Sequence, residues 1–388
     1  MTHYLEDNSP QRTQRAQRKK INLQSLISSL PLLLIPVLYI FTLAQSPVLG
    51  DPSEYTFVAN ILGIAHPPGY AFFTLLGKLV QTIVPIGTIA WRMHLLATVT
   101  ASLGAWFVFG IIRTVAGDLT GFANLSGLFG AFVVATAVNY WQHAIHANPH
   151  ILTATFMAAN LYFLTRWWAE GEGVNGGRGE WVIKSSSTPS PATAGRHHPF
   201  TPSNKWLYAF CLSAGLGITH HPLTVFGFPA YALFIIWVRP SLFKEWRTLL
   251  KMIGFGLLGL SVWLYFPIRS PMAPGFGPTT MNTLNGFLDH VLARGLSDSL
   301  PFFSLADQPD RARVFFSLLR LQYTLPVIFL ALFGLLYPFI SPKASPLHPF
   351  TRSPITLYAL TFLGTYAFVI SLRAQDIMAY LIGSFLLV

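Results

Sequence analysis

Charged residues and cysteines are both scarce in this sequence of 388 residues. Asp, Glu, Lys and Arg make up only 10% of the chain, whereas charged residues approach a quarter of an ordinary soluble protein. The single cysteine, Cys211, excludes an intramolecular disulfide framework, and the Cys and His spacings of a zinc finger are absent. Because 52% of the residues are hydrophobic, the composition indicates a polytopic membrane protein.

Acidic residues are fewer than basic ones, with 14 Asp and Glu against 25 Lys and Arg, and the net charge is +11. The basic residues do not form a stripe with interleaved aromatic residues, which excludes nucleic acid as the expected partner. The lipid bilayer is the expected partner, because the basic residues follow the loops between apolar runs.

Apolar runs of a length close to that of a membrane span recur along the chain, and they predict an all-α bundle of about ten transmembrane helices. The runs cover residues 23–47, 91–112, 122–141, 151–167, 207–219, 223–238, 253–268, 323–340 and 355–372, and a last one begins near residue 377. Since that last run is cut off at Val388, we expect the chain to stop within a helix.

The sidedness of the loops follows from the positive-inside rule. Seventeen of the 25 Lys and Arg residues fall on the side of the N-terminus, which places residues 1–20 in the cytoplasm as a disordered basic tail. Residues 21–388 then form one transmembrane domain. We expect outer loops at 48–90 and 269–321 and a flexible cytoplasmic loop at 168–205.

The stretch from residue 50 to 77 places Asp51, Glu54 and His66 beside the first apolar run, where charge is costly. Asp51 and Glu54 share the first turn of a predicted short helix, which ends before the His66–Pro67–Pro68 sequence because proline cannot donate a backbone hydrogen bond. The pattern predicts a re-entrant or surface-lying pair of helices. The alternative is an acidic N-cap on an interfacial helix.

Most other unusual polar residues fall on the same outer face. They include His143, His146, His150, His220, His221, Arg269, Arg373 and Asp376. The spacing of the first three histidines would align them on one unbroken helix, but Pro149 interrupts it and no Glu or Asp supplements them. We therefore assign no metal site, and a divalent metal stays an alternative. Residues 282–294 are expected to form an amphipathic surface helix.

Several of these motifs occur together in a known family. The sequence GDPSEYTFVANILGIAHPPGYAFFTLLGKL resembles the signature of the domain-of-unknown-function 2723 family, whose animal representatives are protein O-mannosyltransferases. The resemblance extends to residues 217–221, 265–269, 287–290 and 373–380. It departs from the family pattern at Pro52–Ser53, at Asn148 and His150, and at Phe276–Gly277–Pro278.

The resemblance implies the GT-C fold and a membrane glycosyltransferase that takes a sugar, mannose in the animal representatives, from a polyprenyl-phosphate carrier. Asp51 matches the essential acid of the first extracytoplasmic loop and is the expected base, with Glu54 beside it. The acceptor is expected to be a protein Ser or Thr hydroxyl or a glycan. Candidate substrate-binding residues are His66, Pro67, Tyr70, His146, His150, His220, His221, Arg269, Arg373 and Asp376. A transporter or a membrane scaffold without catalysis is the alternative.

Overall fold

The structure is a computed structural model of the whole chain. It describes residues 30–117, 122–175, 204–295, 303–340, 353–372 and 377–387, with the side chains of 172–175 and 337–340 left out. Arg373, Asp376 and the predicted tail at 1–20 lie outside the described residues, as do parts of the predicted loops at 168–205 and 269–321.

All regular elements within those residues are helices, which confirms the predicted all-α class. The α-helices are α2 (Leu34–Phe41), α3 (Asp51–Ile61), α4 (Ala71–Ile83), α5 (Ile89–Ala116), α6 (Phe122–Thr136), α7 (Val138–Ala144), α8 (His150–Asn175), α9 (Lys205–His220), α10 (Phe228–Val238), α11 (Trp246–Leu260), α12 (Tyr265–Arg269), α13 (Leu284–Val291), α14 (Gln308–Gln322), α15 (Leu325–Ile340), α17 (Pro354–Ile370) and α18 (Ile377–Leu386). Short 3-10 helices are η1 (Leu30–Leu33), η3 (Pro222–Gly227), η4 (Pro240–Lys244), η5 (Ser261–Leu264), η6 (Ser270–Met272) and η8 (Leu305–Asp307).

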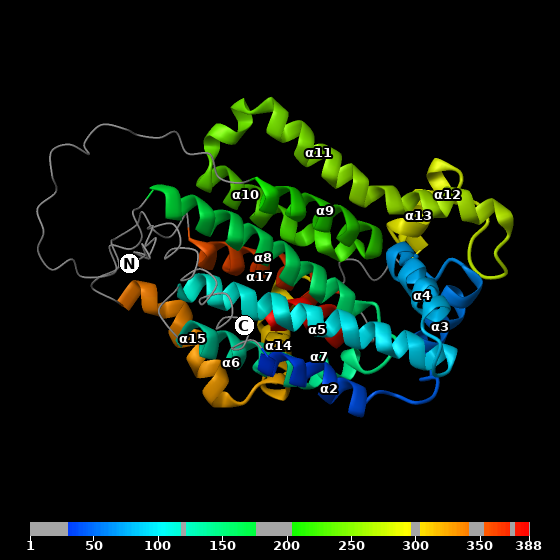
Figure 1. The fold of residues 1–388 in the computed structure, drawn as a ribbon, viewed down its shortest axis with the longest axis horizontal. Helices are drawn as coiled ribbons and strands as arrows, with labels where there is room; N and C mark the ends of the chain where they lie inside the picture. The colour runs from blue at the N-terminus through cyan, green and yellow to red at the C-terminus, as the bar shows by residue number, and fades with distance from the viewer. Residues whose placement is uncertain are drawn as a thin grey trace, which may run out of the picture.

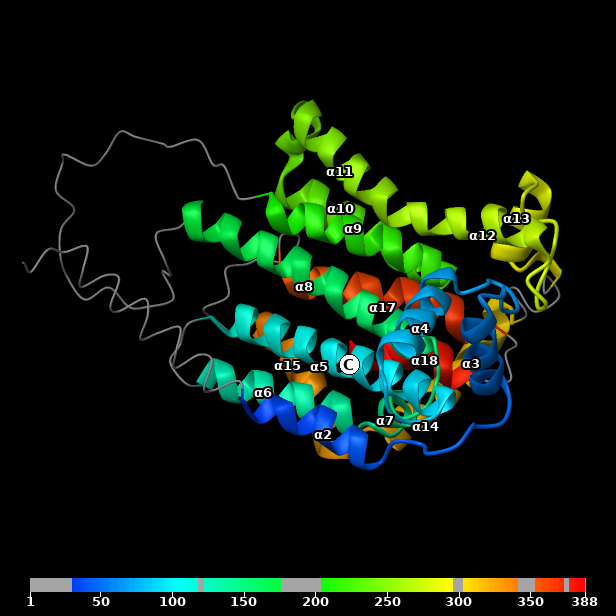
Figure 2. The same ribbon diagram turned by 45° about the vertical axis from the view of Figure 1, so that its right-hand side comes forward.

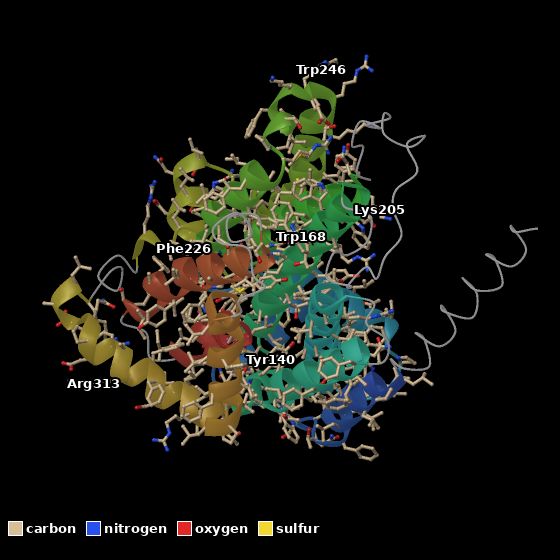
Figure 3. All side chains as sticks on the ribbon, turned by 90° about the vertical axis from the view of Figure 1, so that its left-hand side faces the viewer. Tyr140, Trp168, Lys205, Phe226, Trp246 and Arg313 are labelled. Carbon is tan, nitrogen blue, oxygen red and sulfur yellow. The ribbon has the colours of Figure 1, made fainter. Side chains whose placement is uncertain are left out.

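The long helices lie side by side along the long axis of the molecule. Helix α5 packs against α6 and α8, and α8 packs in turn against α9 (Figure 1). The short helices α3, α4, α12 and α13 gather at one end of this bundle, on the right of Figure 1, and Figure 2 brings that end forward. The opposite end faces the viewer in Figure 3, where Trp168 of α8 and Lys205 of α9 are labelled.

Two helices are long and apolar enough to cross a bilayer, namely 89–116 and 246–272. Two bent pairs would raise the number to four, and the remaining apolar helices among the described residues are shorter. The chain is thus membrane-associated by the character of its helices, while the ten-span bundle stays a prediction.

The predicted span at 122–141 is broken in the structure. Helix α6 ends at Thr136 and α7 begins at Val138, with a bend of 73° between them. Helix α7 then ends at Ala144, and α8 begins at His150. The break before Pro149 confirms that His143, His146 and His150 do not share one helix.

The core near α3 is built from the residues that the sequence pattern placed on one face of that helix. Tyr55, Val58 and Ala59 are buried, and they pack with Tyr70, Met93 and Leu96. Pro52 occupies the first turn, where its missing N–H has no intrahelical partner, and the helix ends at Leu62 in the left-handed conformation. This packing fixes the rotation of α3. Asp51 and Glu54 lie one turn before the buried Tyr55 and Val58, and both acids face His66 at the N-terminal end of the helix.

Candidate functional site

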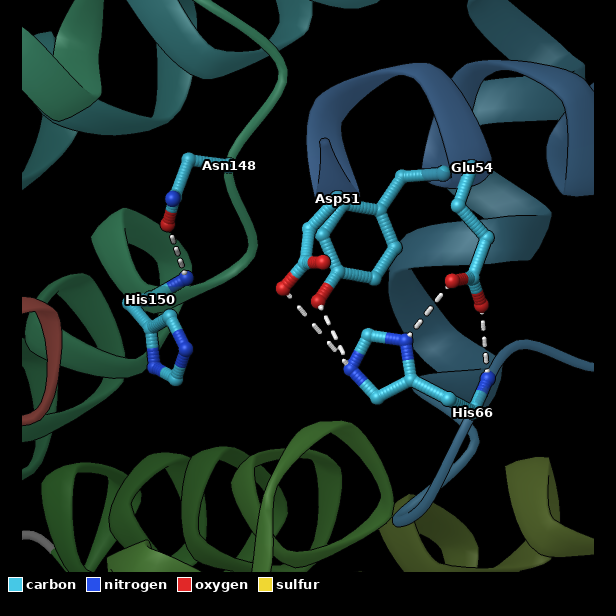
Figure 4. Close-up of polar contacts among 6 residues, drawn as sticks. Asp51, Glu54, His66, Asn148 and His150 are labelled. Carbon is cyan, nitrogen blue, oxygen red and sulfur yellow. Dashed lines mark hydrogen bonds and ion pairs between the residues drawn. The ribbon is translucent and has the colours of Figure 1, made fainter. Parts of the chain in front are cut away.

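The first turn of α3 carries two carboxylates, and the imidazole of His66 lies between them (Figure 4). The Nδ1 of His66 lies 2.9 Å from Glu54 Oε2, and its backbone N–H donates to Glu54 Oε1 at 2.8 Å. On the other side of the ring, Nε2 lies 4.0 Å from Asp51 Oδ2 and 3.3 Å from the hydroxyl of Tyr55. The imidazole therefore bridges a well-anchored carboxylate and a second one that has no close partner.

The two carboxylates differ in exposure, and the difference separates their roles. The side chain of Asp51 is 66% exposed, whereas that of Glu54 is 22% exposed and its two oxygens both accept hydrogen bonds from His66. Asp51 is thus the carboxylate that an incoming molecule can reach. Glu54 holds the ring that faces it.

The ion pair shifts the proton affinities of both partners. Burial alone would raise the pKa of Glu54, but the hydrogen bonds from His66 and its charge outweigh burial and lower that pKa. Burial alone would lower the pKa of His66, but its hydrogen bond to Glu54 and the charges of Glu54 and Asp51 outweigh burial and raise it. The geometry thus favours an imidazolium beside two carboxylates.

These shifts predict how the stability of the protein changes with pH. The Glu54 contribution is complete above its ordinary pKa of 4.5 and is lost as the pH falls through its lowered pKa. The His66 contribution is complete below its ordinary pKa of 6.5 and is lost as the pH rises through its raised pKa. We expect the stability difference between wild type and His66→Gln to be largest between pH 4.5 and 6.5 and to shrink above it. Thermal unfolding of both proteins in detergent, from below pH 4.5 to well above pH 6.5, measures this difference, and a difference that stays constant over that wider range would contradict the ion pair.

Behind the ion pair, the buried ring of Tyr70 is the centre of an aromatic cluster. It contacts Tyr55 at a centroid distance of 5.1 Å and His66 at 5.6 Å. It also contacts three further histidines, His221 at 5.4 Å, His220 at 5.8 Å and His150 at 6.4 Å. Helices α3, α8 and α9 and the turn at His66 therefore meet at the ring of Tyr70. The predicted substrate-binding residues His66 and His221, 155 positions apart, come together there.

Two histidines in this cluster have a ring nitrogen with no hydrogen-bond partner among the described residues. The Nδ1 atoms of His150 and His220 are buried and unpaired, while His220 Nε2 donates to the carbonyl of Pro149 at 2.7 Å. Buried polar atoms are normally paired. These nitrogens are therefore available to a polar ligand or to water.

His146 is not joined to the cluster by any contact among the described residues. Its ring packs against His143 at 5.6 Å, and burial, with the charges of His143 and His94, lowers the pKa of His146 to about 4. His94 ties the neighbouring loop down, since its Nδ1 accepts from the backbone N–H of Ala147 and its Nε2 donates to the carbonyl of Ser46. The structure thus separates His146 from the other predicted histidines.

Arg269 contacts the end of α3 rather than open space. Its Nε donates to the carbonyl of Leu62 at 2.7 Å and its Nη2 to that of Ile61 at 3.1 Å, while Nη1 faces the sulfur of Met272 at 3.7 Å. Terminal carbonyls of a helix are frequent partners for arginine. Arg269 therefore fixes the C-terminus of the helix whose N-terminus carries the two acids.

Residues 265–290 also contact the three residues that follow Leu62, namely Gly63, Ile64 and Ala65. The hydroxyl of Tyr265 donates to the carbonyl of Gly63 at 2.6 Å. The backbone N–H of Ile64 donates to the carbonyl of Phe276 at 3.0 Å. His290 Nε2 donates to the carbonyl of Ala65 at 2.9 Å. We call residues 61–65 the hinge segment, because it leads from α3 to His66 and each of its residues carries one contact from residues 265–290.

The turn after the hinge segment aims His66 at α3. A cis peptide joins Pro67 to Pro68, and Gly69, at φ +93°, donates its N–H to the carbonyl of His66. A Cβ at Gly69 would lie 2.6 Å from the ring of Phe266, so the close approach of α12 requires glycine here. Pro67 is thus part of the turn that presents His66.

Sequence reasoning did not single out Tyr55, Tyr265 or His290. Tyr55 belongs to the apolar face of α3, and nothing in its local pattern marks its hydroxyl as a neighbour of His66. Tyr265 and His290 lie in motifs of the family resemblance, but their partners are backbone atoms about 200 residues away. The amphipathic helix predicted at 282–294 is confirmed as α13, which carries His290.

Comparison with known proteins places these residues in a family. Residues 51–243 match the profile of the protein O-mannosyl-transferase TMEM260 N-terminal domain, and the match begins at Asp51. The chain belongs to this O-mannosyltransferase-like family. It is 27% identical over 72% of its length to protein O-mannosyl-transferase tmem260 of Dictyostelium discoideum and 27% identical over 66% to TMEM260 of Mus musculus.

The family matches cover the site but not whole relatives. The chain spans about one third of the length of each relative, 33% of the Dictyostelium protein and 32% of the mouse protein. No solved structure matches the chain. The family membership predicted from the His-Pro-Pro-Gly-Tyr signature is confirmed.

Proposed function

We propose that this protein is a membrane glycosyltransferase that moves a sugar from a polyprenyl-phosphate donor to a hydroxyl of a protein acceptor, with Asp51 as the base. The observation that carries the proposal is the pairing of an exposed carboxylate, Asp51, with an imidazole anchored by Glu54, at the start of the family match. The relatives are named protein O-mannosyl-transferases, which supports mannose and a protein acceptor.

The reaction needs one proton acceptor and one stabilised leaving group. The Asp51 carboxylate takes the proton of the acceptor hydroxyl while the oxygen of that hydroxyl bonds to the anomeric carbon of the sugar. The bond from that carbon to the carrier phosphate oxygen breaks, and its electron pair leaves on the polyprenyl phosphate, so no separate general acid is needed. A cationic His66 beside Asp51 is suited to the phosphate charge, and this role is consistent with its raised pKa.

The buried aromatic cluster packs against His66 and lies beneath the two carboxylates. Tyr70, His150, His220 and His221 are buried together, and the unpaired Nδ1 atoms of His150 and His220 are suited to sugar hydroxyls. Arg269 was predicted to bind the substrate, and the carrier phosphate is the group that an arginine suits. Its contacts support a positioning role for two of its nitrogens, and Nη1 is the nitrogen left for a phosphate contact.

A divalent metal is the alternative to a proton-transfer site of this kind. Asp51, Glu54 and His66 each offer a ligand atom within 4.8 Å of the others, and they are the one such group among the described residues. However, Glu54 already contacts His66 through Nδ1, while Asp51 faces Nε2 on the other side of the ring. An ion on Nε2 and Asp51 would leave the Nδ1–H bond to Glu54 in place, as is usual for a metal-bound histidine, and only the use of Glu54 as a third ligand would break that bond. We derive no step through a metal.

The decisive experiment is product analysis with purified protein, radiolabelled polyprenyl-phosphate mannose and an acceptor protein. We expect labelled acceptor to form, and to form equally after treatment with a chelator. A protein that binds the donor without turnover would favour the transporter or scaffold alternative. Strong inhibition by the chelator, reversed by a divalent ion, would replace the proton-transfer scheme with a metal site.

We further propose that the bundle crosses the membrane about ten times as one unit, with the N-terminus in the cytoplasm and the site outside. In a background with Cys211→Ala, cysteines are introduced at two exposed positions, Asn285 in α13 and Ser241 in η4. Asn285→Cys should react with an impermeant thiol reagent added to intact cells, and Ser241→Cys should react only after permeabilisation. The reverse pattern would overturn the proposed orientation.

A further inference from the structure

A groove of about 720 Å³ lies between α5 and α8, far from the Asp51 site. Met93 of α5 packs in the same cluster as Tyr55 and Tyr70, and Arg113, which lines the groove, follows twenty residues later on the same helix. A rise of about 1.5 Å per residue puts Arg113 roughly 30 Å along the axis from Met93. The groove is thus a separate site at the opposite end of a candidate membrane span.

The groove has more positive than negative charge among its described residues. Arg113 and Arg166 line it together with Glu170. Glu170 is already satisfied, since it accepts from Trp206 Nε1 at 2.6 Å and pairs with Lys205 at 3.3 Å and with Arg166 at 3.9 Å. Glu170 therefore pairs with two cations, Lys205 and Arg166. Counting Arg113 as well, three positive charges stand against one negative charge, a surplus of two.

The two arginines retain unused hydrogen-bond donors. The Nε of Arg166 is buried and has no partner among the described residues, and its guanidinium lies over the ring of Trp206 at 5.1 Å. Arg113 has no hydrogen bond or ion pair within the described residues. A planar fork of donors suits a phosphate, which accepts several hydrogen bonds at once.

The part of the groove that runs toward the middle of the span is apolar. Leu103, Trp106, Gly110 and Arg113 occupy successive turns on one face of α5, and Leu103 and Trp106 are about half exposed. Tyr162 of α8 lies against Gly110, where a larger side chain would collide with its ring. A molecule that fills the groove therefore needs an anionic head beside the arginines and an apolar chain beside Leu103.

We propose that this groove binds an anionic membrane phospholipid, with its phosphate at Arg113 and Arg166 and an acyl chain along Leu103 and Trp106. Basic pockets between membrane helices bind anionic headgroups in this way, and tryptophan is enriched at the membrane interface. Figure 3 looks onto this end of the bundle, where Trp168 and Lys205 mark α8 and α9. The proposal does not depend on the transfer reaction.

Native mass spectrometry of the full chain in detergent tests the proposal by titration with phosphatidylglycerol. We expect one tightly retained lipid in the wild type and an apparent Kd about 30-fold weaker in Arg113→Gln/Arg166→Gln, since two cations beside the headgroup are lost. Arg247→Gln, which removes an exposed cation stacked on Trp246, is the matched control and should retain the lipid. Arg113→Lys/Arg166→Lys should recover part of the affinity, which separates lost charge from lost folding.

The headgroup and the chain are tested separately. Phosphatidylcholine and inorganic phosphate should each fail to displace the bound lipid, because the first lacks net negative charge and the second lacks an acyl chain. Displacement by inorganic phosphate alone would reduce the groove to a simple anion site and overturn the proposal. Equal lipid retention by the double glutamine variant and the wild type would overturn it as well.

Discussion

Asp51→Asn should abolish transfer while leaving the protein folded. The substitution keeps the shape of the side chain and one hydrogen-bond acceptor, but it removes the basicity that takes a proton from the acceptor hydroxyl. A general base contributes about 10²- to 10⁴-fold to a rate, so we expect the turnover number to fall by at least that factor. Folding should survive because the Asp51 side chain is 66% exposed and its nearest charged atom is 4.0 Å away.

The measurement is initial transfer rate at saturating donor, with donor binding measured separately. Donor affinity should change little, because the proposed phosphate contacts come from His66 and Arg269 rather than from Asp51. Asp310→Asn is the matched control, since Asp310 is an exposed acid in the first turn of α14 paired with Arg313. It should transfer at the wild-type rate. A folded Asp51→Asn protein with the wild-type rate would remove Asp51 as the base.

Gly277→Ala should cause the second largest loss of transfer rate. It acts by displacing the hinge segment and leaves Asp51 and Glu54 unchanged. Gly277 has a φ of +105°, and a Cβ there would collide with the carbonyl oxygen of Ile64 and lie 2.7 Å from the Ile64 Cβ. Ile64 belongs to the hinge segment that leads directly to His66. We expect the segment to shift, and because misplacement by about 1 Å can cost 10²-fold in rate, transfer should fall by about that factor.

Gly275→Ala is the matched control for this substitution. Gly275 lies in the same loop with a φ of +80°, but the nearest atom to its added Cβ is 3.8 Å away, on Ile61. Both variants bear the left-handed backbone cost of about 1 to 2 kcal/mol, and only Gly277→Ala adds the collision. Transfer rates and unfolding temperatures of the two proteins measure the difference. Equal losses of transfer in both would show that backbone strain, rather than the position of the hinge segment, governs activity.

Contacts between the outer segment at 265–290 and the hinge segment give the acid-bearing helix a fixed orientation. Helix α3 has only eleven residues, a length that is marginal on its own in water. Arg269 binds the carbonyls at its C-terminus and Tyr265 binds that of Gly63 just beyond it, while Tyr55 and Val58 bury its inner face. The position of Asp51 therefore depends on residues more than 200 positions away.

The sequence by itself determined the features that depend on near neighbours. The helix at 51–61 and the placement of Asp51 and Glu54 on one turn follow from proline in the first turn and from helical periodicity. The predicted end of the helix at the prolines comes earlier in the structure, at Leu62 in the left-handed conformation. The family was determined too, because its signature is contiguous over residues 50–79, where the match to the family profile also begins.

Only the tertiary structure decided which of the outer polar residues meet. Sequence places His146 and His150 four residues apart, yet His150 joins Tyr70 and the two histidines of α9 and η3, and His146 faces His143 instead. It also decided that Arg269 donates to helix carbonyls and that the hydroxyl of Tyr55 faces His66. These contacts join chain segments that are distant in sequence or depend on how α3 is rotated, and packing of whole helices sets both. Local pattern does not specify that packing, because one apolar face fits several partners until the entire bundle closes.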